Sequence, residues 1–480
     1  MEVVLTWTLL LGYSFFIYQT VQKTTPHRVS AIAFFQGESE QGTPPGLWLL
    51  VFSAAISWIF AKSIENAASL TQAFGISGGI GYGIYYLSFV TAGIVIYFLR
   101  CRGGYHSLPQ FLVDKYGGDC AKLFLGAIAI RLFNEVWSNT KVFSLYFGPE
   151  GSTGYWLAAL CVTAFTVYYS LLGGLRSSLL TDGIQMILAA ILLVIILGFL
   201  SPTLISQGLP RVPPETHHAG LTFCGLALVQ VLSYPFHDPV LTDRAFITAP
   251  KTMLKGFIWA GLLSGSFIIL FSVVGLYALR FDLPGQATLS VPQLFGLPLL
   301  LIFNAIMLTS AGSTLDSTFS SVAKLSGRDW SNAEGQPSEN QAYIGRWAMI
   351  IIAILGNLPL LSIYLGDQVG PAIILATTIS GTMVMGLAPI FLLAFLPRAG
   401  RLSFHLAFWI GLSLGVLRVV ENAFGVEVFP AWVSLGTGRY ALDLGVNVYG
   451  LLLCVGGYLF GMIFPSRPNQ NKSIYRNYSS

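Results

Sequence analysis

Residues 46–75 constrain this chain more than any other segment. They read GLWLLVFSAAISWIFAKSIENAASLTQAFG, and a stretch of this length can cross a bilayer, which takes about 20 mostly apolar residues. Its centre carries Lys62, Glu65 and Asn66. Charged side chains cost at least about 2.5–3.5 kcal/mol each at this depth, so they must face protein or water. Two interpretations follow: a buried structural pair between Lys62 and Glu65 or Asn66, or a binding site at the membrane midplane.

The composition indicates an all-α polytopic membrane protein with about 13 transmembrane helices. Of the 480 residues 54% are hydrophobic and only 10% are charged, and the mean hydropathy is +0.70. Soluble domains carry roughly 25% charged residues. The five cysteines show no paired spacing, the histidines form no metal-binding pattern, and no glycine-rich phosphate loop is present. We therefore expect no cofactor, no enzymatic activity and no nucleic-acid partner.

The distribution of Lys and Arg predicts the orientation in the membrane. Basic residues concentrate in every second loop, as at Arg100, Arg102 and Lys115, and again in the C-terminal tail. Because cytoplasmic loops are enriched in basic residues, we expect the N-terminus outside and the C-terminus in the cytoplasm. The segment near 3–20 lacks a basic leader and a cleavage site, so we interpret it as a retained helix. Without a transit peptide, a bacterial inner (plasma) membrane is the expected location.

A second interrupted helix is expected at residues 220–247. Pro235 and Pro239 flank His237 and Asp238 in this segment. A proline inside a helix removes a backbone hydrogen bond and clashes with the preceding turn. In a membrane such a break persists only where it is buried or lines a cavity. The alternative is a simple proline kink.

The two interrupted helices each open a group of five predicted spans. The first group covers 46–200 and the second 220–396; residues 1–45 hold an extra helix and a cytoplasmic linker, and residues 397–480 hold two extra helices and a cytoplasmic tail. An odd number of spans per group forces opposite orientations, which defines an inverted repeat with its binding site between the broken helices. The substrate-binding candidates from both helices are Lys62, Glu65, Asn66, Gln230, His237 and Asp238.

Hydroxyl side chains follow one face of the predicted helix 295–325. They recur with helical spacing together with one acid, at Thr309, Ser313, Asp316, Ser317 and Ser320. Small hydroxyl residues at this spacing often serve only close helix packing. The alternative is a site for a hard cation, which prefers oxygen ligands. A second acid, Asp182, lies within the apolar run 177–200.

Three segments resemble the sodium:solute symporter family. Residues 168–185, YYSLLGGLRSSLLTDGIQ, match its Y-x-x-x-GG-x-x-x-x-x-x-TD-x-x-Q signature. Thr309 and Ser310 with Ser313 match hydroxyl residues of its eighth core helix, and residues 106–117 resemble its intracellular LPEF segment. The resemblance covers about residues 45–400. It implies the leucine-transporter fold with a 5+5 inverted repeat, in agreement with the repeat inferred above.

The resemblance also implies ion sites. A primary sodium ion would be held by backbone carbonyls and hydroxyls of Phe60, Ser63, Ile306, Thr309 and Ser310. Some relatives hold a second sodium at the positions of Asp182, Thr309 and Ser313. Here Gly312 replaces a serine of that site, so one ligand is missing. Lys62 replaces an asparagine found in sugar transporters, and its ammonium group would either substitute for sodium or bind a substrate carboxylate.

These observations predict sodium-coupled symport of a small polar or zwitterionic organic solute by alternating access. The expected partners are the solute, sodium as coupling ion, and membrane lipid. A proton-coupled or ion-independent transporter, with Lys62 in place of sodium, is the first alternative. A transporter-like sensor, a channel or an intramembrane enzyme are further alternatives, which the sequence supports less because it contains no signalling domain, no continuous polar path and no nucleophile or metal pattern.

Overall fold

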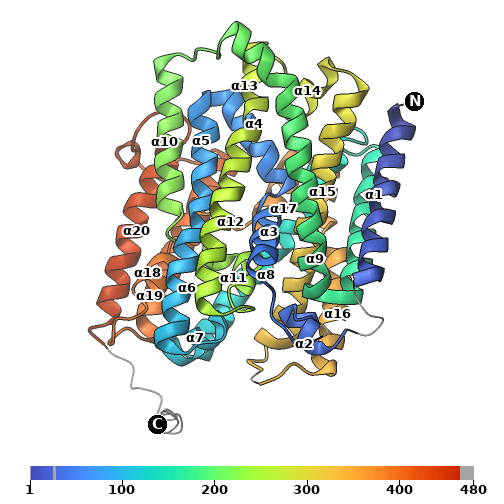
Figure 1. Ribbon diagram of the computed structural model, residues 1–480. Helices are drawn as coiled ribbons and strands as arrows, with labels where there is room; N and C mark the ends of the chain where they lie inside the picture. Colours follow the sequence, from blue (N-terminus) through green and yellow to red (C-terminus); the bar gives the residue numbers. More distant parts are fainter. Residues whose placement is uncertain (1, 25–28, 40, 334, 465–480) are drawn as a thin grey trace.

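The computed structural model describes residues 2–24, 29–39, 41–333 and 335–464, and all its regular elements are helices (Figure 1). Eight of the described helical segments are long and apolar enough to cross a membrane. The sequence predicts about thirteen spans because it counts the two arms of α9 (Thr153–Gln207) separately and also includes helices that are broken or carry charges. The basic tail residues that entered the orientation argument lie outside the described residues.

The first core helix is broken as the sequence predicts. Its halves α3 (Leu47–Trp58) and α4 (Ala61–Phe74) meet at a 60° bend. Ile59 leaves the helical region there, with φ −83° and ψ 68°. The chain continues through a second core helix, a short helix at the lower end of Figure 1 and a long third helix, formed by α5 (Ile76–Ile84), η1 (Tyr85–Leu87), α6 (Ser88–Gly103), α7 (Leu108–Tyr116) and α8 (Gly118–Ser144).

Helix α9 (Thr153–Gln207) consists of two arms that fold back on one another at Gly174. This glycine has φ 54° and ψ −135°, a conformation that L side chains rarely adopt. Tyr169 and Thr181 lie on opposite sides of it, yet their hydroxyls bind the same carboxylate, that of Asp316. In a straight helix they would be about 18 Å apart along the axis. The reversal therefore brings both arms of α9 to one face of α15 (Leu297–Lys324).

The second broken helix lies where the prolines predict it. Helix α10 (Pro214–Gln230) ends before the turn η2 (Tyr234–His237), and α11 (Pro239–Arg244) follows. Each proline stands in the first turn of its element, where the missing N–H has no partner to lose. The rest of this half comprises α12 (Pro250–Phe271), α13 (Val273–Arg280), α14 (Ala287–Leu294), α15, η3 (Leu325–Asp329), α16 (Glu339–Leu355), η4 (Leu358–Tyr364), α17 (Gly366–Ala376) and α18 (Leu387–Leu392).

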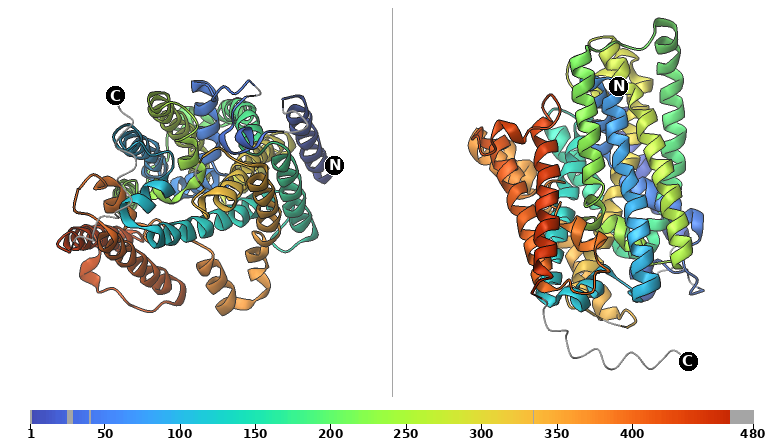
Figure 2. Two further views of the ribbon diagram at one scale, coloured as in Figure 1. Left: turned by 90° about the horizontal axis from the view of Figure 1, so that it is seen from below. Right: turned by 90° about the vertical axis from the view of Figure 1, so that its left-hand side faces the viewer.

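Four of the described helices lie outside the two groups. Helix α1 (Glu2–Thr24) packs on α9 and α15, and α2 (Ala31–Gln36) closes the lower end of the same region. Helices α19 (Arg401–Phe424) and α20 (Ala441–Gly461) pack side by side at one edge of the bundle (Figure 2). The buried core lies among α3, α8, α9, α12 and α15, and these helices also carry most of the buried polar residues.

Candidate ion and substrate sites

The bend between α3 and α4 meets the hydroxyl face of α15. The hydroxyl of Ser310 donates to the backbone carbonyl of Ile59, and Ser310 is fully buried. The carbonyl of Phe60, which the sequence analysis proposed as a ligand, accepts the amide of Ile64 at 3.0 Å and begins α4. The backbone carbonyl of this break that contacts α15 is therefore that of Ile59.

The other predicted ligands of the primary ion site divide into two groups. Ile306 and Thr309 are fully buried beside Ser310 on α15, and the Thr309 hydroxyl donates to the carbonyl of Ala305 at 2.7 Å. Ser63 lies on α4, where its hydroxyl accepts a hydrogen bond from Tyr82 at 3.0 Å. The oxygen atoms of α15 and of the bend thus approach one another, while the Ser63 side chain faces a neighbouring cavity.

That cavity has a volume of about 460 Å³, which suits a small organic molecule. Its wall combines aromatic rings with charged and amide side chains from both broken helices and from α8. Its lining residues include Trp58, Lys62, Glu65, Asn66, Tyr82, Tyr85, Arg131, Glu135, Gln230 and Tyr234.

Lys62 and Glu65 line the cavity without neutralising each other. Among the described residues, no carboxylate oxygen lies within 4.0 Å of the Lys62 ammonium group, whose nearest aromatic contact is the Trp137 ring at 5.9 Å. Glu65 accepts a hydrogen bond from Ser69 at 2.6 Å. The structural ion pair considered from the sequence is therefore absent in the described structure, and both charges are available to a bound molecule.

Arg131, on α8, is a further charged residue of the cavity wall. Its guanidinium forms ion pairs with Glu135 and, at 3.0 Å, with Asp238, and it lies 5.5 Å from the Phe60 ring centroid. The sequence contains a sign of this ion pair, because Arg131 and Glu135 stand four positions apart inside an apolar helix. Its link to Asp238 joins residues 107 positions apart, which helical spacing cannot predict.

The predicted substrate residues of the second broken helix lie at two depths, one in the cavity wall and two behind it. Gln230 lines the cavity and accepts a hydrogen bond from Tyr85 at 2.5 Å. His237 and Asp238 are fully buried and are not part of the cavity wall. His237 contacts the carbonyl of Tyr234 through Nδ1 at 2.5 Å, and Asp238 reaches the cavity only through Arg131. The break turns both side chains into the bundle in the described conformation, and their role in substrate binding stays a prediction.

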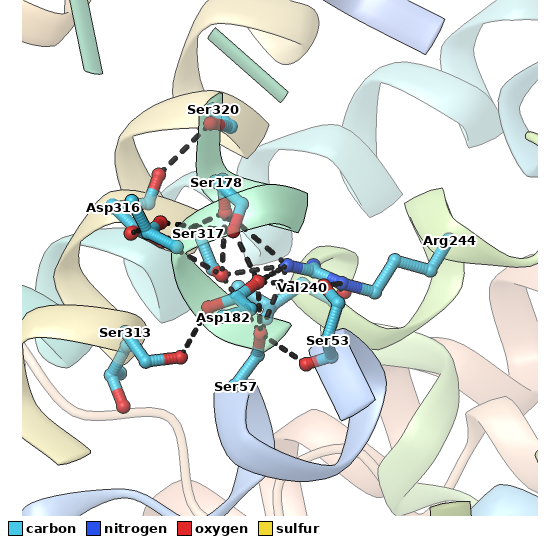
Figure 3. Close-up of polar contacts among 12 residues, drawn as sticks. Ser53, Ser57, Ser178, Asp182, Val240, Arg244, Ser313, Asp316, Ser317 and Ser320 are labelled. Carbon is cyan, nitrogen blue, oxygen red and sulfur yellow. Dashed lines mark hydrogen bonds and ion pairs between the residues drawn. The ribbon is translucent and has the colours of Figure 1, made fainter. Parts of the chain in front are cut away.

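A fully buried guanidinium, that of Arg244, joins four core helices below the bend (Figure 3). Its Nη2 forms an ion pair with Asp182 at 3.0 Å and donates to Ser317 at 2.7 Å and Ser57 at 2.9 Å. Its Nε donates to Ser53 at 2.8 Å. Nothing in the local sequence reveals that α11 directs Arg244 toward α3, α9 and α15.

Asp182 and Asp316 face this network from α9 and α15. Asp182 accepts hydrogen bonds from Ser313 and, at 2.6 Å, from Ser53. Asp316 accepts from Tyr169 and Ser178, each at 2.7 Å. The predicted second-ion residues Asp182 and Ser313 are therefore in contact, whereas the Thr309 hydroxyl bonds to its own helix.

A second cavity of about 540 Å³ lies on the other side of the Arg244 network. It is lined by α2, α7, the end of α11 and η3, which gather at the lower end of Figure 1. At its wall Lys324 forms ion pairs with Asp243 at 2.7 Å and Asp329 at 2.9 Å. The packed, hydrogen-bonded layer around Arg244 thus separates two cavities.

Two discontinuous helices that meet at a polar cavity within an all-helical membrane bundle define the leucine-transporter fold, a fold of integral membrane transporters. A Na+-coupled sialic acid symporter in a substrate-bound outward-open state matches with a TM-score of 0.73 and 15% identity, over 97% of this chain and 98% of that one. Mhp1, a nucleobase-cation-symport-1 family transporter, matches in a closed conformation with a TM-score of 0.55 and 13% identity, over 93% and 97% of the two chains. The predicted fold is confirmed.

Sequence similarity points in the same direction. No family model matches the chain. Sodium/myo-inositol cotransporter 2 of Bos taurus is 20% identical over 381 residues, which are 67% of this chain and 56% of that protein. Solute carrier family 5 member 4B of Mus musculus is 23% identical over 115 residues, 24% of this chain and 17% of that protein. The chain thus spans about half or less of these relatives, and the resemblance to sodium:solute symporters is confirmed.

Proposed function

We propose that this protein is a secondary active transporter that couples sodium to the uptake of a small polar or zwitterionic organic solute. The observation that carries the proposal is the contact of the Ser310 hydroxyl with the open carbonyl of Ile59 beside a polar cavity. Hydroxyl and carbonyl oxygens are the ligands that a hard cation prefers. We propose the ligand set Ile59, Phe60, Ser63, Ile306, Thr309 and Ser310, in which Ile59 extends the set expected from the sequence.

Sodium at this position would stabilise the outward-facing state. The ion would join α15 to the bend between α3 and α4, and α4 carries Lys62, Glu65 and Asn66 into the cavity. Because the ion orders the helix that binds the solute, each ligand would increase the affinity for the other, which is coupling in the thermodynamic sense. The membrane potential contributes about 2.3 kcal/mol per charge per 100 mV.

The charges of the cavity support a zwitterionic solute. Lys62 and Glu65 stand one helical turn apart and are not paired with each other, so one solute could present a carboxylate to Lys62 and an ammonium group to Glu65. Asn66 and Gln230 add amide groups on two sides, Asp238 acts from behind through Arg131, and His237 contacts the backbone of the cavity residue Tyr234. This arrangement suits a small polar solute better than a large apolar one.

Alternating access would require the layer around Arg244 to open. In the described conformation Arg244 holds α11 against α3 and α9, between the two cavities. Solute would be released toward the cavity lined by α7 and η3, whose wall contains Lys324 and Arg328. We propose this side as the cytoplasmic side of a bacterial plasma membrane, because basic loop residues are enriched there. The C-terminus would share that side.

The alternative of ion-independent or proton-coupled transport depends on Lys62. Its ammonium group lines the solute cavity and contacts the Trp137 ring, whereas the sodium ligands proposed above, apart from Ser63, lie at the bend and on α15. This separation favours a role of Lys62 in solute binding. The sensor and enzyme alternatives have no comparable observation in their favour.

The test is the thermal stability of the purified full-length protein in sodium against potassium at equal ionic strength. A ligand that binds only the native state adds RT ln(1 + [L]/Kd), or about 2.7 kcal/mol at one hundred times Kd. We expect a sodium-specific rise in Tm that Ser310→Ala abolishes. Ser264→Ala is the matched control, since Ser264 is equally buried but donates only to its own helix at Ala260. Equal stability of the wild type in both salts would refute sodium coupling.

A further inference from the structure

The turn between α7 and α8 places a carboxylate and a thiol side by side. Gly117 ends α7 and precedes α8 with φ 105° and ψ 163°, and α8 begins at Gly118. Asp119 and Cys120 therefore stand in the first turn of α8, at the end of the bundle where α7 lies (Figure 1). A Cβ atom on Gly117 would stand 3.2 Å from Asp119 Oδ1, so the glycine keeps the space beside this carboxylate open.

An imidazole from α19 faces both side chains. His405 Nε2 lies 2.9 Å from Asp119 Oδ2 and 3.7 Å from Cys120 Sγ. Because both contacts use the same ring nitrogen, three possible ligand atoms converge on one point, all within 4.8 Å of one another. Spacing in the sequence gives no sign of this cluster, since Asp119 and His405 are 286 positions apart.

The distances in the cluster match those of a tetrahedral zinc site. Zinc lies about 2.3 Å from a Cys sulfur and about 2.0–2.2 Å from a His nitrogen or an Asp oxygen. Tetrahedral angles then separate sulfur from nitrogen by about 3.6 Å and nitrogen from oxygen by about 3.3 Å. The observed 3.7 Å between Cys120 Sγ and His405 Nε2 fits, and the 2.9 Å between His405 Nε2 and Asp119 Oδ2 would lengthen by about 0.4 Å when the ion replaces their hydrogen bond.

The cluster is buried on one side and accessible on the other. Cys120 is fully buried, whereas the side chains of His405 and Asp119 are 27% and 41% exposed. An ion can thus enter from solvent and keep a water molecule in its fourth position, as zinc sites with three protein ligands do. Beside the cluster, the ring of Tyr116 packs on the Phe404 ring at 5.6 Å between centroids and fixes the end of α7 against α19.

Arg401 is the group that an ion would displace. Its Nε lies 2.9 Å from the same oxygen Oδ2 of Asp119, and its side chain is 63% exposed. Such an exposed pair is weak, so the guanidinium can turn into solvent. A divalent ion would then balance the charges of the Asp119 carboxylate and the Cys120 thiolate, whose proton is released to water on binding.

We infer that Asp119, Cys120 and His405 form a zinc site that joins α8 to α19. The combination of sulfur, nitrogen and oxygen ligands selects zinc over calcium and magnesium, which take oxygen ligands. Helix α8 also carries Arg131 and Glu135 to the solute cavity. The ion would thus tie a helix of the cavity wall to the pair α19 and α20, which lies outside the two five-helix groups. This zinc binding does not depend on the proposed sodium coupling.

The experiment measures the zinc affinity of the purified full-length protein, without an affinity tag, by competition with a chromophoric chelator. We expect one zinc ion per wild-type protein. Cys120→Ser and His405→Gln each remove one of three ligands and should weaken binding about one hundredfold or more, beyond the 10–100-fold that loss of a metal ligand's hydrogen-bond partner costs. The matched controls Cys101→Ser, at an exposed thiol, and His217→Gln, on α10, should bind zinc as the wild type does.

A fifth variant makes the test specific. Arg401→Met removes the competing guanidinium but no ligand, so it should tighten zinc binding by up to about fivefold. Because a ligand of the native state raises its stability, zinc but not magnesium should raise Tm in the wild type and in Arg401→Met, and neither ion should do so in His405→Gln. His405 lies at the rim of the cluster, so this variant keeps the test valid where replacing the buried Cys120 disturbs packing.

Two results would overturn the inference: a wild type that binds no zinc, or zinc binding that His405→Gln and Cys120→Ser leave unchanged, which would place the ion on other surface groups. Both assays run without sodium and without solute. Their failure would therefore leave the proposed transport function intact, and a protein that binds zinc at this cluster but gains no stability from sodium would refute sodium coupling alone.

Discussion

Replacing Arg244 by methionine tests whether the buried network holds the fold together. Its Nη2 lies 3.0 Å from Asp182, and neither side chain is exposed. At an effective dielectric constant of about 20, two unit charges at this distance attract each other by about 5–6 kcal/mol. Removing one partner of a buried pair costs about 3–5 kcal/mol, because the other charge is left without compensation. We therefore expect Arg244→Met to lower the free energy of unfolding by about 3–5 kcal/mol.

The comparison with an exposed pair isolates the effect of burial. Arg401 and Asp119 are 2.9 Å apart, but their side chains are 63% and 41% exposed. Exposed pairs contribute only about 0–1 kcal/mol, since water and salt screen them. Arg401→Met should thus cost less than about 1 kcal/mol. Equilibrium unfolding in mixed micelles, with one detergent composition for all variants, measures both changes.

A double variant separates lost charge pairing from lost packing. Asp182→Asn removes the acid's charge but keeps hydrogen-bonding atoms for Ser53 and Ser313. In the Arg244→Met background it should therefore recover at least about 1.4 kcal/mol of the loss, a tenfold change in the unfolding equilibrium. The reasoning is refuted if Arg244→Met costs no more than Arg401→Met, or if the double variant is no more stable than Arg244→Met.

Two further changes test other parts of the structure. Gly174→Ala should lower Tm, with a cost of about 1–3 kcal/mol in the free energy of unfolding, because Gly174 has φ 54° and the added Cβ would stand 2.5 Å from a ring carbon of Phe34. The control Gly126→Ala adds its Cβ in open space and should leave Tm unchanged. Equal Tm values for the two variants would contradict the role of the reversal at Gly174. Lys62→Met should abolish binding of a carboxylate-bearing solute but keep the sodium-dependent rise in Tm; loss of that rise would place Lys62 in the ion site instead.

Local features of the sequence were sufficient to predict the class of protein and the presence of its broken helices. Hydropathy, charge depth and proline position depend on residues within one or two turns, so they identify the membrane spans and the interruptions near Ile59 and Pro235. The hydroxyl residues Thr309 and Ser313 follow from helical spacing in the same way, whereas Ser310 was expected only from the resemblance to sodium:solute symporters. The signature around Asp182 marks a buried acid because a charge inside an apolar helix must find a partner.

Only the tertiary structure determined which residues meet. Asp238 pairs with Arg131, Arg244 with Asp182, and Tyr13 with Gln185, across 107, 62 and 172 positions. These contacts depend on how whole helices tilt, reverse and pack. Periodicity within one helix fixes which residues share a face but not which helix that face meets. For this reason the sequence predicted the bend and the hydroxyl face, whereas the fold alone decided that Arg244 closes the core and that α1 takes part in it.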